Sequence, residues 1–240
     1  SVGAFQQEIN QFTGSVNGGV CFRCIVSGKM GYASTEELSA DEATAVVERA
    51  ADNAACLETK DPVFLGEGGQ VYEKLELHPY DLPTTEELIS TVLDTQKTMY
   101  ATSEKVVDGT TTQGVSERSR IAIYNSKGLD LSYVNQSAGL VCLAVVSDGT
   151  EMSNHVAIRL GKLDTMDRSD LTAKAVSGAL EKMGGESVET GVYPVIFDSK
   201  AMSNLLSTFS GIFSSEAAQK GLSRLADAEG KLVASEAVTI

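Results

Sequence analysis

The 240-residue sequence is poor in the residues that mark several classes of protein. It has no tryptophan, two histidines and four cysteines. So few cysteines exclude a disulfide scaffold and favour a reducing compartment. Cys21 and Cys24 have the C-x-x-C spacing of some metal and redox sites, but they lie in the strand-like run VCFRCIV. Because residues three apart on a strand face opposite sides, we expect core thiols there and neither a metal site nor a redox pair.

Basic residues are scarce as well. The sequence has 19 lysines and arginines against 33 aspartates and glutamates, which gives a net charge of −14. An acidic protein lacks the positive surface that binds phosphate backbones, so no nucleic-acid partner is expected. No apolar run approaches the ~20 residues that span a bilayer, so no membrane partner is expected either. Together with the cysteine usage, these absences predict a cytoplasmic protein.

The first 58 residues show a pattern of strands followed by a helix. We expect the strands to cover residues 1–12, 20–26 and 29–34. Asn17-Gly18 is typical of a tight hairpin turn. Ser39 and Glu42 have the spacing of a capping box, and apolar residues then recur every three or four positions to about Glu58. Residues 1–58 are therefore predicted to form a first strand-strand-helix unit.

Residues 84–190 repeat this order in expanded form. A capping box of Thr84 and Glu87 opens a helix that extends to about Lys105. The strands predicted after it cover residues 114–124, 129–135, 140–146 and 151–160, with turns at 125–128 and 148–149. A further helix follows and stops at Gly184-Gly185. The repeated order indicates an internal duplication, and the whole predicts an α+β fold with two antiparallel sheet-plus-helix units.

The strand predicted over residues 151–160 has one apolar and one polar face. Its apolar face carries Met152, Val156, Ile158 and Leu160. His155 lies on the polar face, and the other histidine, His78, precedes a proline. Neither histidine has a nucleophile or a second metal ligand near it in the sequence. We therefore expect both to be solvated or hydrogen-bonded histidines without a chemical role.

Residues 59–83 interrupt the pattern, since they contain three of the four prolines. We interpret them as a connector that crosses the surface, with one short strand at 71–77. The last segment, residues 191–240, opens with the apolar run Tyr193–Phe197, which predicts a buried strand. Asp198 or Ser199 then caps a helix. The apolar face of that helix carries Met202, Leu205, Leu206, Phe209 and Phe213. Its polar positions hold no His, Glu or Cys.

Four stretches carry a resemblance to a known family: residues 193–213 (YPVIFDSKAMSNLLSTFSGIF), 232–240 (LVASEAVTI), 125–128 (NSKG) and 159–167 (RLGKLDTMD). They resemble the PmbA/TldD family, whose members are also described as candidate modulators of DNA gyrase. In the TldD branch, the helix after the strand carries an HExxxH metal motif. Laid on this sequence, the motif places Ser207 at the first His, Thr208 at the Glu and Ile212 at the second His. The chain thus resembles the PmbA branch, also called TldE, which keeps the fold and lacks the motif.

The resemblance implies a PmbA/TldE-like, non-catalytic subunit of a TldD/TldE-type metallopeptidase that acts on peptides. Its partner would be a TldD-type paralogue or a second copy, and zinc is expected only in a TldD-type partner. No catalytic or metal-binding residue is assigned to this chain, and its substrate-binding residues stay unknown. Family members are longer than this chain. We therefore expect it to be cropped at both ends, with residues 191–240 leading into a missing β-rich C-terminal domain.

Two other functions stay open at this point. The chain could be a metallopeptidase in its own right, with ligands on the missing C-terminal half. It could also be a peptide- or protein-binding module without a peptidase partner, which adds an extended peptide to a free sheet edge. A neighbouring gene for an HExxxH paralogue would distinguish the non-catalytic subunit from the binding module without a peptidase partner. In each case we expect an apolar surface to be exposed near residues 192–240.

Overall fold

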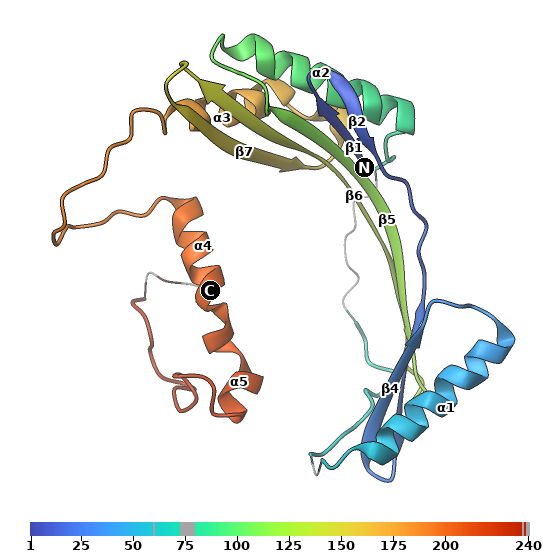
Figure 1. Ribbon diagram of the computed structural model, residues 1–240. Coiled ribbons are helices and arrows are strands. Elements are labelled where there is room, and N and C mark those ends of the chain that lie inside the picture. Colours follow the sequence, from blue (N-terminus) through green and yellow to red (C-terminus); the bar gives the residue numbers. More distant parts are fainter. Residues whose placement is uncertain (60, 73–79, 237, 239–240) are drawn as a thin grey trace. The chain divides into compact units, whose positions relative to one another are not determined.

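A computed structural model describes residues 1–59, 61–72, 80–236 and 238 (Figure 1). The chain divides into two compact units, residues 1–185 and residues 186–240. The first unit contains two antiparallel sheets with helices packed on them, which confirms the predicted α+β class. None of the described helices is both long enough and apolar enough to cross a membrane.

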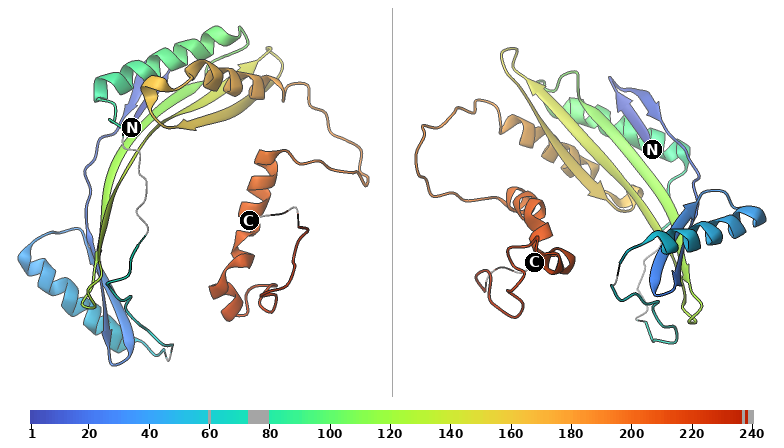
Figure 2. Two further views of the ribbon diagram at one scale, coloured as in Figure 1. Left: turned by 180° about the vertical axis from the view of Figure 1, so that it is seen from behind. Right: turned by 60° about the horizontal axis from the view of Figure 1, so that its bottom comes forward.

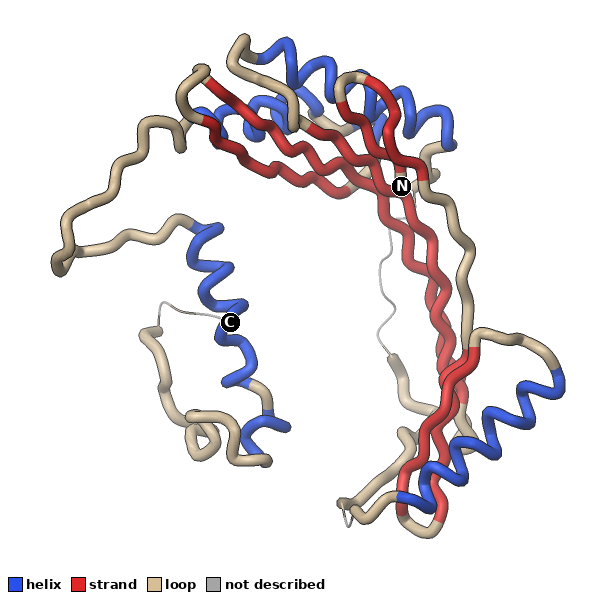
Figure 3. Tube along the Cα trace, viewed as in Figure 1, coloured by secondary structure: helices blue, strands red, loops and turns tan. Residues whose placement is uncertain are grey.

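The larger sheet of the first unit has five strands in the order β2-β1-β5-β6-β7, all antiparallel to their neighbours (Figure 3). The strands are β1 (Val2–Phe5), β2 (Glu8–Phe12), β5 (Thr111–Tyr124), β6 (Asp130–Ser147) and β7 (Met152–Leu160). Helices α2 (Thr85–Thr102) and α3 (Arg168–Leu180) cover one face of this sheet (Figure 2). A 3₁₀ turn, Leu163–Thr165, joins β7 to α3.

The core of the first unit lies between these helices and the sheet. Alternate residues of β6 point into it and are fully buried: Ala138, Leu140, Cys142, Ala144 and Val146. Gly114 of β5 lies opposite α2, and a Cβ atom there would stand 2.6 Å from Val92 and 2.7 Å from Leu88. The missing side chain therefore lets α2 pack directly on the backbone of β5.

The smaller sheet pairs β3 (Val20–Val26) with β4 (Lys29–Thr35), and α1 (Ala40–Cys56) packs on it. Its buried residues are few and small: Ala33, Val46 and Ala50, with Phe22 and Cys24 half-buried beside them. Gly31 makes the contact close, since a Cβ atom there would lie 1.8 Å from the carbonyl oxygen of Ala50. The Ser39 hydroxyl caps α1 by accepting from the Glu42 amide, as its spacing predicts.

The strands of residues 1–58 join two different sheets, which differs from the single unit expected there. Residues 2–12 form a hairpin, and its strand β1 pairs with β5 across about a hundred residues of sequence. The hairpin turns at Gln6 and Gln7, whose φ angles are 50° and 61°. The tight turn predicted at Asn17-Gly18 is not formed, because residues 13–19 run without a turn from one sheet to the other.

One further prediction for the larger sheet was wrong in part. The strands expected at 129–135 and 140–146 are one continuous strand, β6, because the residues between them pair with β5 without a bulge. The two faces of β7 have the composition predicted: the face with Ser153, His155 and Arg159 points toward α3, and the apolar face is the more exposed one. The turns at residues 125–128 and 148–149 are present, with Gly128 and Gly149 at positive φ.

The connector is held by the turn between β5 and β6. The Asn125 side-chain amide donates to the carbonyl oxygen of Gly66 (2.7 Å), and the Gly68 amide donates to that of Lys127 (3.0 Å). A Cβ atom on Gly68 would lie 2.0 Å from the Gly128 carbonyl oxygen, so this contact requires glycine. Residues 61–72 contain neither helix nor strand, and most of the strand predicted at 71–77 lies outside the described residues.

The second unit contains α4 (Ser199–Phe209), a 3₁₀ turn at Ser210–Phe213 and the short helix α5 (Ser215–Gln219). The strand predicted at Tyr193–Phe197 is not formed, because the run has no strand partner there. The described part of this unit exposes many large apolar side chains, including Val192, Ile196 and Phe209. The apolar surface expected in this segment is therefore present.

Candidate functional site

The positions that match the HExxxH motif lie at the end of α4. The carboxylate of Asp198 caps this helix and accepts from the Ala201 amide at 2.6 Å, as its place in the sequence predicts. Ser207 and Thr208 are in the last turn of α4, which ends at Phe209. Ile212 lies beyond that end, in the 3₁₀ turn. The three positions therefore lie on two different kinds of helix.

The hydroxyl groups around this helix end bond to nearby backbone. The Thr208 hydroxyl donates to the Asn204 carbonyl oxygen at 2.8 Å, and the Ser210 hydroxyl donates to that of Ser207 at 2.8 Å. The carbonyl oxygen of Ile212 accepts from the Ser223 hydroxyl. A carbonyl oxygen is no general base, so these bonds hold the hydroxyls in place without activating them as nucleophiles.

A hollow of about 470 Å³ opens beside this turn within the second unit. Its lining is mainly apolar and small: Ile212, Phe213, Ser214, Ser215, Ala218, Gln219, Leu225, Ala226, Ala228, Glu229, Lys231 and Val233. The ammonium group of Lys231 donates to the Asp227 carbonyl oxygen at 2.7 Å. The lining contains no His or Cys, so the hollow offers contact surface for an apolar group and no evident chemistry.

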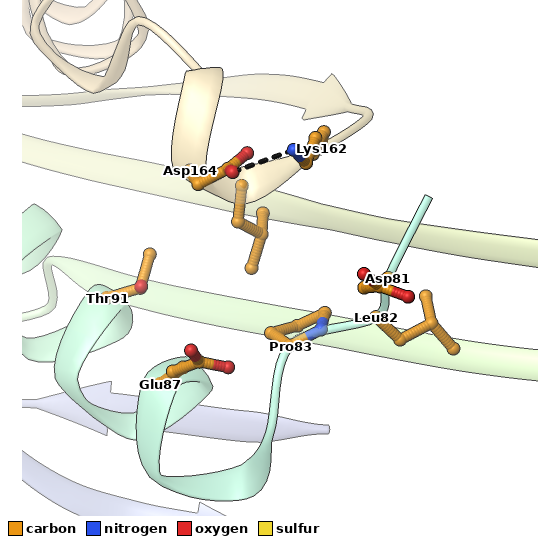
Figure 4. A pocket seen from close by; sticks show the side chains of 8 residues that line it. Asp81, Leu82, Pro83, Glu87, Thr91, Lys162 and Asp164 are labelled. Carbon is orange, nitrogen blue, oxygen red and sulfur yellow. Dashed lines mark ion pairs between the residues drawn. The ribbon is translucent and has the colours of Figure 1, made fainter. Parts of the chain in front are cut away.

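A second hollow, of about 280 Å³, lies in the first unit between the start of α2 and the end of β7 (Figure 4). It is lined by Asp81, Leu82, Pro83, Glu87, Thr91, Lys162, Leu163 and Asp164. The ammonium group of Lys162 and the carboxylate of Asp164 form an ion pair at 2.9 Å, and both side chains are largely exposed. The Glu87 carboxylate is committed to the capping box, because it accepts from the Thr84 amide at 2.8 Å.

The charges of this hollow explain its pKa shifts. The hydrogen bond with Asp164 raises the pKa of Lys162, and the charges of Asp164 and Asp81 add to it. The pKa of Glu87 is lowered, chiefly by the hydrogen bond from the Thr84 backbone. The helix cap thus favours the charged form of Glu87, and the ion pair favours the charged form of Lys162. Their arrangement has structural causes and requires no ligand.

One of the two histidines, His155, lies among the described residues. His155 packs against α3 at Gly178, where a Cβ atom would stand 2.6 Å from the imidazole Cδ2. Gly178 is the one feature of the sequence that could indicate this contact. It does so only once the structure shows that α3 packs on β7. His78 lies outside the described residues. Among the residues that are described, no group of three His, Cys, Asp or Glu side chains could hold a metal ion.

Two family models match the chain, one at each end. A model described as PmbA/TldA metallopeptidase domain 1 matches residues 1–54, which contain both N-terminal hairpins and most of α1. A model described as PmbA/TldA metallopeptidase C-terminal domain matches residues 190–240, which contain α4 and the hollow beside it. No curated protein matches the chain at a significant level.

Three solved structures share the fold. A candidate modulator of a DNA gyrase from Thermotoga maritima has a TM-score of 0.81 at 22% identity, over 96% of this chain and 52% of its own. A protein from Bacteroides thetaiotaomicron with the same description has a TM-score of 0.79 at 18% identity, over 93% and 52%. TldE from Thermococcus kodakarensis has a TM-score of 0.64 at 16% identity, over 75% and 41%.

The chain thus spans about half the length of the solved proteins that it matches. A zinc site of the HExxxH kind does not fit the residues at the end of α4, since Ser207, Thr208 and Ile212 supply two neutral hydroxyls and an aliphatic side chain. The family models nevertheless match on both sides of the chain, and one of them includes this helix. Together with the shared fold, the two matches support the PmbA/TldD family for this chain.

Proposed function

We propose that the chain is a non-catalytic, PmbA/TldE-type subunit of a metallopeptidase system that acts on peptides, and that it pairs with a TldD-type paralogue. The observation that carries this proposal is the set of side chains at the end of α4. A catalytic zinc normally takes three His, Cys or carboxylate ligands and leaves a position open for water. The chain offers Ser207 and Ile212 at the matching positions. Neither side chain is a useful zinc ligand at neutral pH.

The position of the general base is equally unsuited. A metallopeptidase uses a carboxylate to take a proton from the zinc-bound water. Thr208 stands at that position, and its hydroxyl donates to the Asn204 carbonyl oxygen within the helix. A hydroxyl titrates far above neutral pH, so it cannot act as the base. Zinc and the general base of the proposed complex would both come from the partner.

Two alternatives follow from specific observations. The chain spans about half of the solved relatives, so a longer protein could carry ligands elsewhere and be a peptidase in its own right. The apolar hollow beside the 3₁₀ turn would instead suit a peptide-binding module without a peptidase partner. The likeness to a protein described as TldE favours the non-catalytic subunit. A cytoplasmic location, peptide substrates and the absence of nucleic-acid and membrane partners belong to the same proposal.

Co-expression with a paralogue that carries HExxxH tests this proposal. We expect the two chains to co-purify with zinc bound to the complex, and the chain alone to cleave no peptide. A double variant, Ser207→Ala with Thr208→Ala, should leave the peptidase activity of the complex unchanged. The matched control replaces the first histidine of the paralogue by alanine and should abolish the activity. Peptidase activity of the chain alone, or loss of activity in a folded double variant, would overturn the proposal.

A further inference from the structure

Residues 20–56 form a body of their own within the first unit, and we call them the α1 module. The module consists of the smaller sheet and α1, packed around Ala33, Val46 and Ala50. Among the described residues, this core shares no member with the core of the larger sheet. In the same parts of the chain, no hydrogen bond or ion pair joins the module to the larger sheet, α2 or α3. Parts that share so little interface move relative to one another by default.

Two stretches of chain join the α1 module to the larger sheet, and the described residues of both are irregular. Residues 13–19 are exposed throughout and include Gly14, Gly18 and Gly19. Glycine has more backbone freedom than any other residue. On the other side of the module, residues 61–72 of the connector form neither helix nor strand. Neither stretch therefore fixes the direction of the module by its own structure.

The connector is bonded to the larger sheet at residues 66–68, which we call the latch. The latch lies on the turn between β5 and β6. The Asn125 side-chain amide donates to the Gly66 carbonyl oxygen at 2.7 Å, and the Gly68 amide donates to the Lys127 carbonyl oxygen at 3.0 Å. Two hydrogen bonds of opposite direction thus hold the latch on the turn.

The latch can open without disturbing either core, because none of its residues and none of the turn residues belongs to one. The ion pair of Glu67 with Lys127, at 3.1 Å, adds little, since 74% and 46% of these side chains are exposed. Water replaces hydrogen bonds at such a surface, so their net contribution is small. As far as residues 57–72 are described, no other hydrogen bond joins them to the larger sheet. Openings of this low cost occur in native proteins.

We propose that the latch holds the α1 module in one orientation on the larger sheet, and that its opening lets the module turn as a rigid body about residues 13–19. The module keeps its own core in this motion, and the larger sheet keeps its core as well. Hinges between rigid parts are formed in the same way, by a few loop residues. This inference does not rest on the proposed function.

Two variants open the latch from opposite sides. Gly68→Ala acts on the connector, because a Cβ atom there would lie 2.0 Å from the Gly128 carbonyl oxygen. The matched control is Gly66→Ala on the same connector, where a Cβ atom meets nothing within 4 Å and the carbonyl oxygen still accepts from Asn125.

Asn125→Asp acts on the turn and provides a second test in case Gly68→Ala folds poorly. The new carboxylate keeps the oxygen that accepts from the Lys127 and Leu129 amides, at 2.9 and 3.1 Å, so the turn itself is retained. It replaces the amide donor by an oxygen that faces the Gly66 carbonyl oxygen. The amide of residue 68 should then exchange with solvent about tenfold faster or more.

Double electron–electron resonance between two spin labels would measure the orientation of the α1 module. One label is placed on Cys56, which is exposed at the end of α1, and the other on Lys97→Cys, which is exposed on α2. Cys21→Ser and Cys24→Ala remove the other accessible thiols, and Cys142 is buried. We expect one narrow distance distribution for the wild-type latch and for Gly66→Ala, and a broader, shifted one for Gly68→Ala and Asn125→Asp.

Circular dichroism would establish that each variant is folded. A distribution as broad with the wild-type latch as with Gly68→Ala would overturn the inference, because the latch would then hold nothing. A narrow distribution that neither Gly68→Ala nor Asn125→Asp changes would overturn it as well, because other contacts would then hold the module. A change that Gly66→Ala produces to the same extent would also contradict it.

Discussion

Gln96 joins three segments of the first unit through one buried side chain. It lies on α2 and is fully buried. Its Nε2 group donates to the carbonyl oxygens of Ala4, at 2.7 Å, and Thr110, at 3.1 Å. Its Oε1 atom accepts from the Gln7 amide at 2.7 Å. The helix thereby holds both the N-terminal hairpin and the chain that enters β5, so we expect Gln96→Leu to loosen that whole end of the sheet.

The size of the effect follows from these bonds. Leucine is close in volume to glutamine but has no polar atom, so three backbone groups would lose their partner. Leaving one buried donor or acceptor unsatisfied costs about 1–3 kcal/mol. Water can replace the glutamine oxygen at Gln7, which is exposed, and so only the two carbonyl groups count fully. We expect Gln96→Leu to lower the free energy of unfolding by about 2–4 kcal/mol.

Urea unfolding followed by far-UV circular dichroism would measure the change. The matched control is Thr98→Ala on the same helix, because the Thr98 side chain is exposed and donates only to the Asp94 carbonyl oxygen of its own helix. Its effect should stay within about 0.5 kcal/mol. Hydrogen exchange should also show faster exchange of amides in β1 and β2 for Gln96→Leu. An unfolding free energy as high as that of the control would refute the reasoning.

Three further outcomes are expected. Gly31→Val should displace α1, because a Cβ atom at this position would lie 1.8 Å from the Ala50 carbonyl oxygen, and limited proteolysis should then cut residues 20–56 faster. Burial raises the pKa of Cys142 to about 12, so its thiol should stay unreactive toward Ellman's reagent at pH 8 until urea unfolds the chain. Hydrogen bonds, first from the Thr150 hydroxyl, lower the pKa of Asp148 from 3.8 to about 2. The stability this adds is present above pH 4 and lost as the pH falls toward 2, so wild type and Asp148→Ala should converge there in urea midpoint.

The parts of the fold that depend on neighbouring residues could be predicted from the sequence. Thr84 and Glu87 form the complete capping box, and Ser39 caps α1 at the position expected. These bonds form within three residues, so their spacing alone determines them. The turn at Asn125–Gly128 was predicted for the same reason. The sequence could not show that this turn also holds Gly66 and Gly68, because the connector reaches it across some sixty residues.

The parts that depend on distant partners could not be predicted in this way. β1 pairs with β5, and no local pattern indicates that pairing. The alternation of β7 was predicted, but not which of its two faces the helices cover. On the helix side Gly178 leaves room for His155, and Arg159 forms an ion pair with Asp170 of α3 at 2.6 Å. A single sequence does not show which face of a strand a distant helix covers.

The last prediction concerns zinc binding at the end of α4. There the type of the side chains and the geometry of the backbone are two separate obstacles to a zinc site. The sequence predicts that Ser207, Thr208 and Ile212 bind no zinc, because of their side chains. The structure adds that residue 212 follows the end of the α-helix at Phe209 and lies in a 3₁₀ turn, which has a different rise and a different number of residues per turn. The Ser223 hydroxyl holds that turn through the Ile212 carbonyl oxygen.

Restoring the three side chains should therefore not restore the site. We expect the triple variant Ser207→His, Thr208→Glu and Ile212→His to bind zinc only weakly in a competition titration with a chelating dye. Residues five apart do not share a face of a continuous α-helix, so the placing of the second histidine depends on the path of the 3₁₀ turn, which the Ser223 hydroxyl holds. The control is the same triple variant with Ser223→Ala, which frees the turn and should bind zinc more tightly if the junction is the obstacle. Stoichiometric, tight zinc binding by the triple variant alone would show that residue type was the only barrier, and that the geometry of the helix end plays no part.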